Sequence, residues 1–125
     1  MTPYTISAIK AQPLKHIELG KTLMNKGLYN EAFDHFKKSI ESNADCAIDI
    51  LIYLYKQDGH KHSPVNIQLV CAKIYIEINQ HQEAFDMFNE ILEDNPNHEA
   101  TYEALAKLMV KKQLRTKIKH QNAIV

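Results

Sequence analysis

Two segments of the chain carry nearly the same pattern. Residues 82–95 read QEAFDMFNEILEDN, and residues 30–43, which begin 52 positions earlier, read NEAFDHFKKSIESN. Aligned at this offset, the two segments share Glu-Ala-Phe-Asp, a second Phe, a Glu and the final Asn. Self-similarity of this kind is typical of architectures in which similar units stack on their sequence neighbours. The repeated segment therefore predicts a stacked array rather than one closed core.

The composition fits an ordinary globular protein. The 125 residues include fifteen basic and fifteen acidic side chains, and 45% of the residues are hydrophobic. Balanced charge gives no overall attraction to nucleic acid or to an anionic membrane. No apolar run is long enough to cross a bilayer, and the first residues lack the pattern of a secretory signal. We expect a cytoplasmic protein without a membrane partner, with Cys46 and Cys71 as buried free thiols.

Hydrophobic periodicity divides the chain into three parts. We expect a loosely ordered N-terminal segment at 1–12, a helical domain at 13–112 and a basic C-terminal extension at 113–125. Pro13 suits the first position of a helix, where its missing N–H costs nothing. The domain should hold about six helices, and their expected ranges are 13–26, 31–42, 45–57, 64–78, 82–94 and 96–111. Helix 45–57 is apolar nearly all round, which predicts that it is covered on more than one side.

The repeated segments and the helices before them resemble the tetratricopeptide repeat, a 34-residue unit of two antiparallel helices. The matching positions of the first copy are Leu19, Gly20, Leu23, Gly27, Tyr29, Ala32 and Phe36. Those of the second copy are Cys71, Ala72, Tyr75, Ala84, Phe88 and Pro96. The chain departs from the pattern at Ser39, Ala44, Asn79, His81 and Ile91. The resemblance implies an all-α fold, a tetratricopeptide-like right-handed array of antiparallel helix hairpins.

Small residues in such a repeat let two helices approach closely, and aromatic residues fill the gap to the next helix. The residues expected to carry this packing are Gly20, Ala32, Phe36, Ala72, Ala84, Phe88 and Pro96. Beyond the second hairpin, helix 96–111 is expected to act as a cap.

The spacing of the two copies departs from the family, because 18 residues intervene beyond the 34 of one repeat. In one interpretation, helix 45–57 is a first helix that has lost its hairpin partner. In the other, it forms a hairpin with helix 64–78 through the loop 58–63, and helix 64–78 serves two neighbours. An odd helix between repeats can expose an apolar face, which would favour a homodimer.

In proteins of this kind, partners lie in the concave face lined by the first helix of each hairpin. By position, the groove residues here are Ile17, Lys21, Asn25, Leu51, Tyr55, Asn66, Leu69, Val70, Lys73 and Lys107. Such a mixture of apolar side chains and recurring lysines suits an extended or helical peptide with apolar anchors and acidic residues. The expected partner is therefore a protein or peptide.

No motif in the sequence points to a reaction. The three glycines are isolated, so no phosphate-binding loop is present, and His60 and His62 alone do not make a metal site. We expect no catalytic residue, no cofactor and no metal, and therefore a non-enzymatic interaction module acting as an adaptor or scaffold. One alternative is a small chaperone for a secreted or assembly partner. An alternative of another class is a weak nucleic-acid binder through the basic tail, which lacks interleaved aromatic residues for base stacking.

Overall fold

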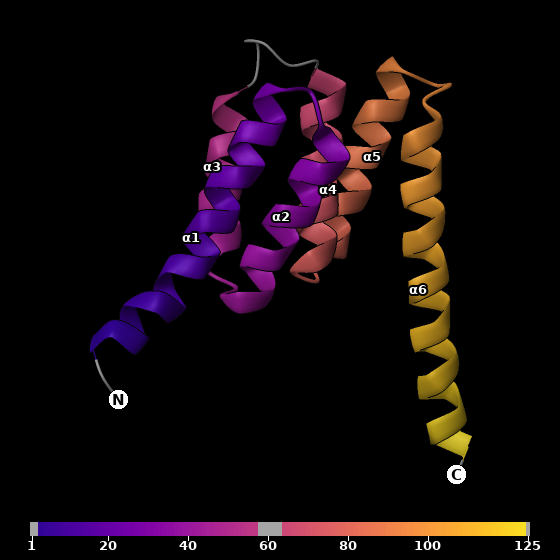
Figure 1. Cartoon of the computed structure of the whole chain (residues 1–125). Helices are drawn as coiled ribbons and strands as arrows, with labels where there is room; N and C mark the ends of the chain where they lie inside the picture. Colours follow the sequence, from indigo (N-terminus) through magenta and orange to yellow (C-terminus); the bar gives the residue numbers. More distant parts are fainter. Residues whose placement is uncertain (1–2, 58–63, 125) are drawn as a thin grey trace.

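The computed structural model describes the backbone of residues 3–57 and 64–124 and the side chains of residues 12–57 and 64–111. All regular secondary structure in this part of the chain is helical, and the helices pack side by side (Figure 1). Their bounds are α1 Pro3–Asn25, α2 Tyr29–Ser42, α3 Cys46–Lys56, α4 Pro64–Glu77, α5 His81–Asp94 and α6 Glu99–Ile124. None of these described helices is both long enough and apolar enough to span a membrane.

The first helix begins at Pro3, ten residues before the start that the sequence predicts, so Pro13 lies inside α1. A proline within a helix has no N–H to donate to the carbonyl four residues earlier. At the same place the hydroxyl of Ser39 in α2 donates a hydrogen bond of 2.7 Å to the Pro13 carbonyl. Ser39 is fully buried. The contact therefore ties α2 to the middle of α1.

The turns that close the two hairpins have the same backbone geometry. Gly27 and Asn79, which are 52 positions apart, both take positive φ angles, of 77° and 61°. In each turn the next residue, Leu28 or Gln80, donates its N–H to the carbonyl five residues earlier at 2.9 Å. This left-handed ending satisfies carbonyls that the helix leaves free. Asn79 departs from the family glycine in type but keeps its conformation, since Asn tolerates the left-handed region.

The packing inside the two hairpins also corresponds. Phe36 in α2 and Phe88 in α5 are fully buried. A Cβ placed on Gly20 of α1 would lie 2.6 and 2.9 Å from Cδ1 and Cζ of Phe36, which is too close for two carbon atoms. The equivalent position in α4 is Ala72, which is itself fully buried. Of the residues expected to carry repeat packing, all are buried except Pro96, which is exposed.

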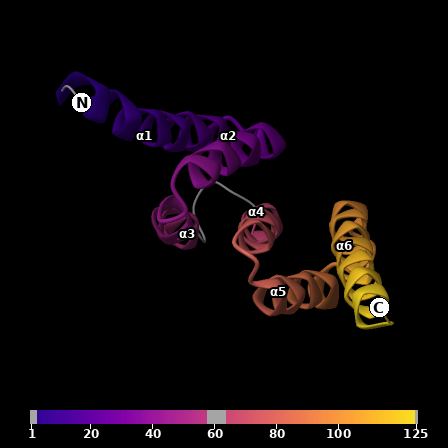
Figure 2. The same cartoon turned by 90° about the horizontal axis from the view of Figure 1, so that it is seen from below.

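Helix α4 is the centre of the array. It contacts α2 and α3 on the first-hairpin side and α5 and α6 on the other side, and Figure 2 shows it among these helices. The buried residues of α4 accordingly divide between two apolar cores. Ile67, Val70, Cys71 and Ile74 join the core of the first hairpin, and Leu69 and Ala72 join that of the second.

Helix α3 contacts α1, α2 and α4, whereas the described parts of α3 and α5 do not touch. This arrangement matches the interpretation in which helix 64–78 serves two neighbours. The contacts also explain the apolar sequence of α3, whose residues Ile50 and Leu54 are fully buried. Its cover is incomplete, however, because Ile48, Ile52 and Tyr55 remain 62, 49 and 53% exposed.

Candidate functional site

A groove runs between α2, α4 and α6. It consists of two adjoining hollows of about 560 and 330 Å³ that share Asn30, Lys73 and Ala100. The larger hollow lies between the three helices, and the smaller one reaches the turn between α1 and α2. We call this continuous feature the α2/α4/α6 groove. Its volume and shape suit side chains of a peptide rather than a deeply enclosed small molecule.

Lys73 of α4 lies at the junction of the two hollows. Its Nζ donates a hydrogen bond of 3.3 Å to Oδ1 of Asn30 and stands 5.5 Å from the centroid of the Phe33 ring. Burial lowers the pKa of Lys73, the charge of Lys107 lowers it further, and Asp34 acts in the opposite direction. Among the described residues, Lys73 forms no ion pair. A partly buried ammonium beside a second ammonium would be stabilised by a carboxylate placed between them.

The remaining lining of the groove is mixed. Lys37 of α2 lies 4.0 Å from Glu77 of α4, which makes an ion pair at the limit of contact. Apolar surface is provided by Phe33, Ile76 and Leu108. A groove of this composition can accept apolar anchors and also fix the orientation of a polar partner through a few charges.

The structure brings part of the predicted set together. Of the ten predicted groove residues, five line the α2/α4/α6 groove: Asn66, Leu69, Val70, Lys73 and Lys107. Of these, Leu69 and Val70 are largely buried, at 9 and 3% exposure, so they form its floor. Tyr55 lines a different cavity, between α3, α4 and α5.

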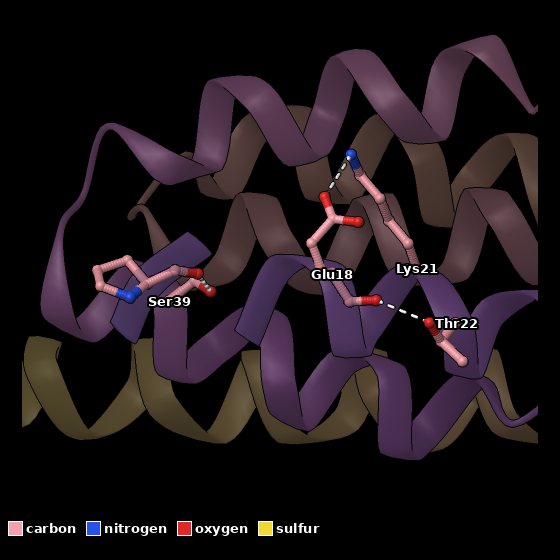
Figure 3. A network of polar contacts seen from close by, with 5 residues as sticks. Glu18, Lys21, Thr22 and Ser39 are labelled. Atoms are coloured by element: carbon pink, nitrogen blue, oxygen red, sulfur yellow. Dashed lines mark hydrogen bonds and ion pairs between the residues drawn. The ribbon is translucent and has the colours of Figure 1, made fainter. Parts of the chain in front are cut away.

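The other predicted groove residues lie on the first hairpin or α3, away from this groove. Ile17 is buried in the first core, and Leu51 packs against that core. Asn25 is exposed near the end of α1. Lys21 lies 3.4 Å from Oε1 of Glu18 and 5.2 Å from the centroid of the Tyr53 ring (Figure 3 shows the ion pair).

The sequence-based prediction missed the contribution of α2. The face formed by Asn30, Phe33, Asp34 and Lys37 lines the groove, although α2 is the second helix of its hairpin. Helix α2 contacts α4 directly, while α3 lies against α1, α2 and α4. The spacing of these four residues, at three or four positions, places them on one helix face and was the available signal.

Reactive groups are not assembled in the part of the chain that has described side chains. No group of three or more His, Cys, Asp or Glu residues is placed there to hold a metal ion. Cys46 and Cys71 are free and buried, and burial raises the pKa of Cys71 to about 12, which disfavours the reactive thiolate. His60, His62 and the basic side chains beyond Lys111 lie outside the described side chains.

Comparison with known proteins gives one match. The tetratricopeptide repeat family model matches residues 16–46, which cover the second half of α1, all of α2 and the link to α3. No curated protein and no solved structure matches the chain. Repeats of this family generally mediate binding between proteins and are typically not enzymes. The chain therefore contains a tetratricopeptide repeat at residues 16–46, within an all-α helical array of the tetratricopeptide type.

Proposed function

We propose that this protein is an interaction module that binds a segment of a partner protein in the α2/α4/α6 groove. The partner segment is an extended or helical peptide with apolar anchors and at least one carboxylate. In a cell, such binding would serve an adaptor or scaffold role. The observation that carries the proposal is the pair Lys73 and Lys107, two neighbouring cations in a groove whose lining mixes apolar and charged side chains.

The groove supports this occupant in two ways. A carboxylate between Lys73 and Lys107 would relieve the repulsion between the two ammonium groups and form charge-assisted hydrogen bonds. Apolar side chains of the same peptide would cover Phe33 and Ile76, which are only partly buried. Burial of that surface supplies affinity, while the charges fix the register of the peptide.

Selection from a displayed peptide library on the immobilised full chain tests the proposal. We expect the enriched peptides to combine an acidic residue with apolar residues at helical or alternating spacing. Lys107→Glu is the informative variant, because Lys107 is exposed and its replacement should leave the core intact. We expect it to weaken binding of a selected peptide by about tenfold or more, which corresponds to about 1.4 kcal/mol.

The matched control is Lys15→Glu, which makes the same charge change on an exposed residue of α1, outside the groove. This control should bind the selected peptide with unchanged affinity. Equal affinity of the Lys107→Glu variant and the unchanged chain would refute the assignment of the groove. Enrichment of peptides without acidic residues would refute the proposed chemistry of the partner.

A further inference from the structure

A second cavity opens on the other side of α4, between α3, α4 and α5. Its volume is about 470 Å³, and its walls include Tyr55 of α3, Tyr75 of α4 and Met87 of α5. The hydroxyl groups of Tyr55 and Tyr75 are hydrogen-bonded to each other at 2.9 Å. None of the side chains that line this cavity is basic, among those that the structure describes. It shares no residue with the α2/α4/α6 groove.

One wall of this cavity continues into an apolar stripe. Ile48, Ile52 and Tyr55 lie along the outer face of α3, four and three residues apart, and roughly half or more of each side chain is exposed. The described residues cover this stripe only in part. Three large apolar side chains in line on one helix are typical of a surface that packs against another helix.

The opposite wall is acidic. Glu83, Asp86 and Glu90 line the cavity from α5, and their spacing of three and four residues places them on one helix face. Gln82 donates a hydrogen bond of 3.0 Å to Asp86. None of the three acids forms an ion pair with a described basic side chain. The surface therefore offers an apolar stripe and an acidic stripe on either side of one cavity.

The C-terminal half of α6 has the complementary pattern in its sequence. One series of apolar residues recurs every four positions: Val110, Leu114 and Ile118. A series of basic residues, each directly after one of these, has the same spacing: Lys111, Arg115 and Lys119. On a helix these two series fall on adjacent strips. Val110, the first residue of the apolar series, is 55% exposed. The segment 110–119 spans ~15 Å as a helix, long enough to cover a stripe of ~10 Å on α3 or on α5.

This half of α6 cannot reach the cavity of its own chain. Helix α6 continues to Ile124 and extends past the ends of α4 and α5 (Figure 1). Seen along α4, the helices α4 and α5 separate α6 from α3 (Figure 2). Docking within one chain would therefore require α6 to break, whereas docking on a second copy leaves both chains folded.

We infer that two copies of this chain associate by exchanging the C-terminal halves of α6, each inserted between α3 and α5 of the other. Val110, Leu114 and Ile118 cover Ile48 and Ile52, and Arg115 and Lys119 pair with Glu83, Asp86 and Glu90, whereas Lys111 lines the α2/α4/α6 groove of its own chain. The exchange is mutual, so the assembly closes as a two-fold dimer. This inference does not depend on the proposed peptide groove.

Light scattering coupled to size-exclusion chromatography of the full chain tests the dimer. We expect twice the chain mass of 14.4 kDa at low salt. Raising the salt from about 50 mM to about 500 mM should weaken association by about tenfold or more, because the exposed charge pairs become screened. A monomer at low salt over the whole accessible concentration range would overturn the inference, as would species larger than a dimer.

Charge-reversal variants test whether the basic strip of α6 and the acidic wall of the cavity form the dimer interface. Arg115→Glu with Lys119→Glu should give a monomer, and so should Glu83→Lys with Glu90→Lys. An equimolar mixture of the two variants should restore a dimer, since every reversed strip then meets a complementary one. The control Lys15→Glu with Lys26→Glu reverses two exposed charges on the first hairpin and should stay dimeric.

A synthetic peptide of residues 107–125 provides a measurement that does not depend on how the variants fold. The fluorescently labelled peptide should bind the Arg115→Glu, Lys119→Glu chain, whose cavity is intact, and should not bind the Glu83→Lys, Glu90→Lys chain. Circular dichroism establishes that both variant chains are helical. Equal binding of the peptide by both variants would overturn the inference. Failure of the mixture to form a dimer would also overturn it.

Discussion

The two hairpins, α1–α2 and α4–α5, have the same geometry but different buried chemistry. In both, the first helix ends in a left-handed turn, and an aromatic ring is buried opposite a small residue. The first hairpin adds polar contacts, among them the buried bond from Ser39 to the Pro13 carbonyl. The position equivalent to Ser39 in the second hairpin is Ile91, which is fully buried among apolar residues. Close packing of helices therefore requires the small and aromatic residues, whereas the remaining interface can be polar or apolar.

A second difference lies further along the same interface. In the first hairpin, Nδ1 of His16 lies 3.0 Å from Nδ1 of His35, and the two rings stack with centroids 5.2 Å apart. The equivalent residues of the second hairpin are Gln68 and Met87, which cannot titrate near neutral pH. At these two positions the first hairpin should therefore respond to pH in a way that the second does not.

Of the two tests of this comparison, Gly20→Ala should change the unfolding free energy more. Its Cβ would meet the buried ring of Phe36, and overpacking of this kind costs about 1–3 kcal/mol of unfolding free energy. The gain in helix propensity, about 1 kcal/mol, acts in the opposite direction and should not compensate. Urea unfolding measures the difference between variant and unchanged chain.

The control for this substitution is Ala72→Gly at the equivalent position of the second hairpin. It introduces no clash and should cost about 0.5–1 kcal/mol, the usual penalty of glycine in a helix. A Gly20→Ala chain as stable as the unchanged one would show that Phe36 moves aside without cost, and that the close approach of α1 and α2 is not required.

Replacing His16 and His35 with the equivalent residues of the second hairpin should change the unfolding free energy less. Burial lowers the pKa of His16, with His35, Lys38 and Lys15 contributing through their charges. The folded pKa lies below the unfolded value of 6.5, so the unfolded chain binds more protons as the pH falls. The stability that neutral His16 contributes is therefore complete above the unfolded pKa and is lost as the pH falls through the folded pKa.

The measurement is the urea midpoint of the unchanged chain and of the His16→Gln, His35→Met variant at about pH 7.5 and about pH 5. We expect the unchanged chain to lose more stability between these two values than the variant does. The same loss in both chains would assign the pH dependence to groups other than this pair.

The sequence predicted the fold because the determining signals are local. The repeated Glu-Ala-Phe-Asp segments, Gly20 and Gly27 specify a hairpin through contacts within about 20 residues, which periodicity and turn chemistry report. The start of α1, in contrast, was not predicted correctly from the sequence. The helix continues through Pro13, and the Pro13 carbonyl accepts a hydrogen bond from Ser39, 26 residues away, which no local pattern shows.

The groove was harder to predict because it depends on the position of α3. Lys73, Lys107 and Asn66 were in the predicted set and line it, whereas Ile17 is in the core. An inserted helix changes which neighbour α4 packs against, and that choice is made by tertiary contacts rather than by the spacing of residues. Phe33 accordingly packs against the core of the first hairpin and also lines the groove.

Helix α4 contributes buried residues to the cores of both hairpins and should therefore join them into one cooperative unit. Native-state hydrogen exchange of the α4 amides from Val70 to Ile74, in Phe36→Leu and Phe88→Leu chains, tests it most directly. We predict that either substitution lowers the protection of these amides, because the core of each hairpin includes residues of α4. If Phe88→Leu alone lowered the protection, and Phe36→Leu destabilised α2 but left the protection of α4 unchanged, α4 would not couple the two cores.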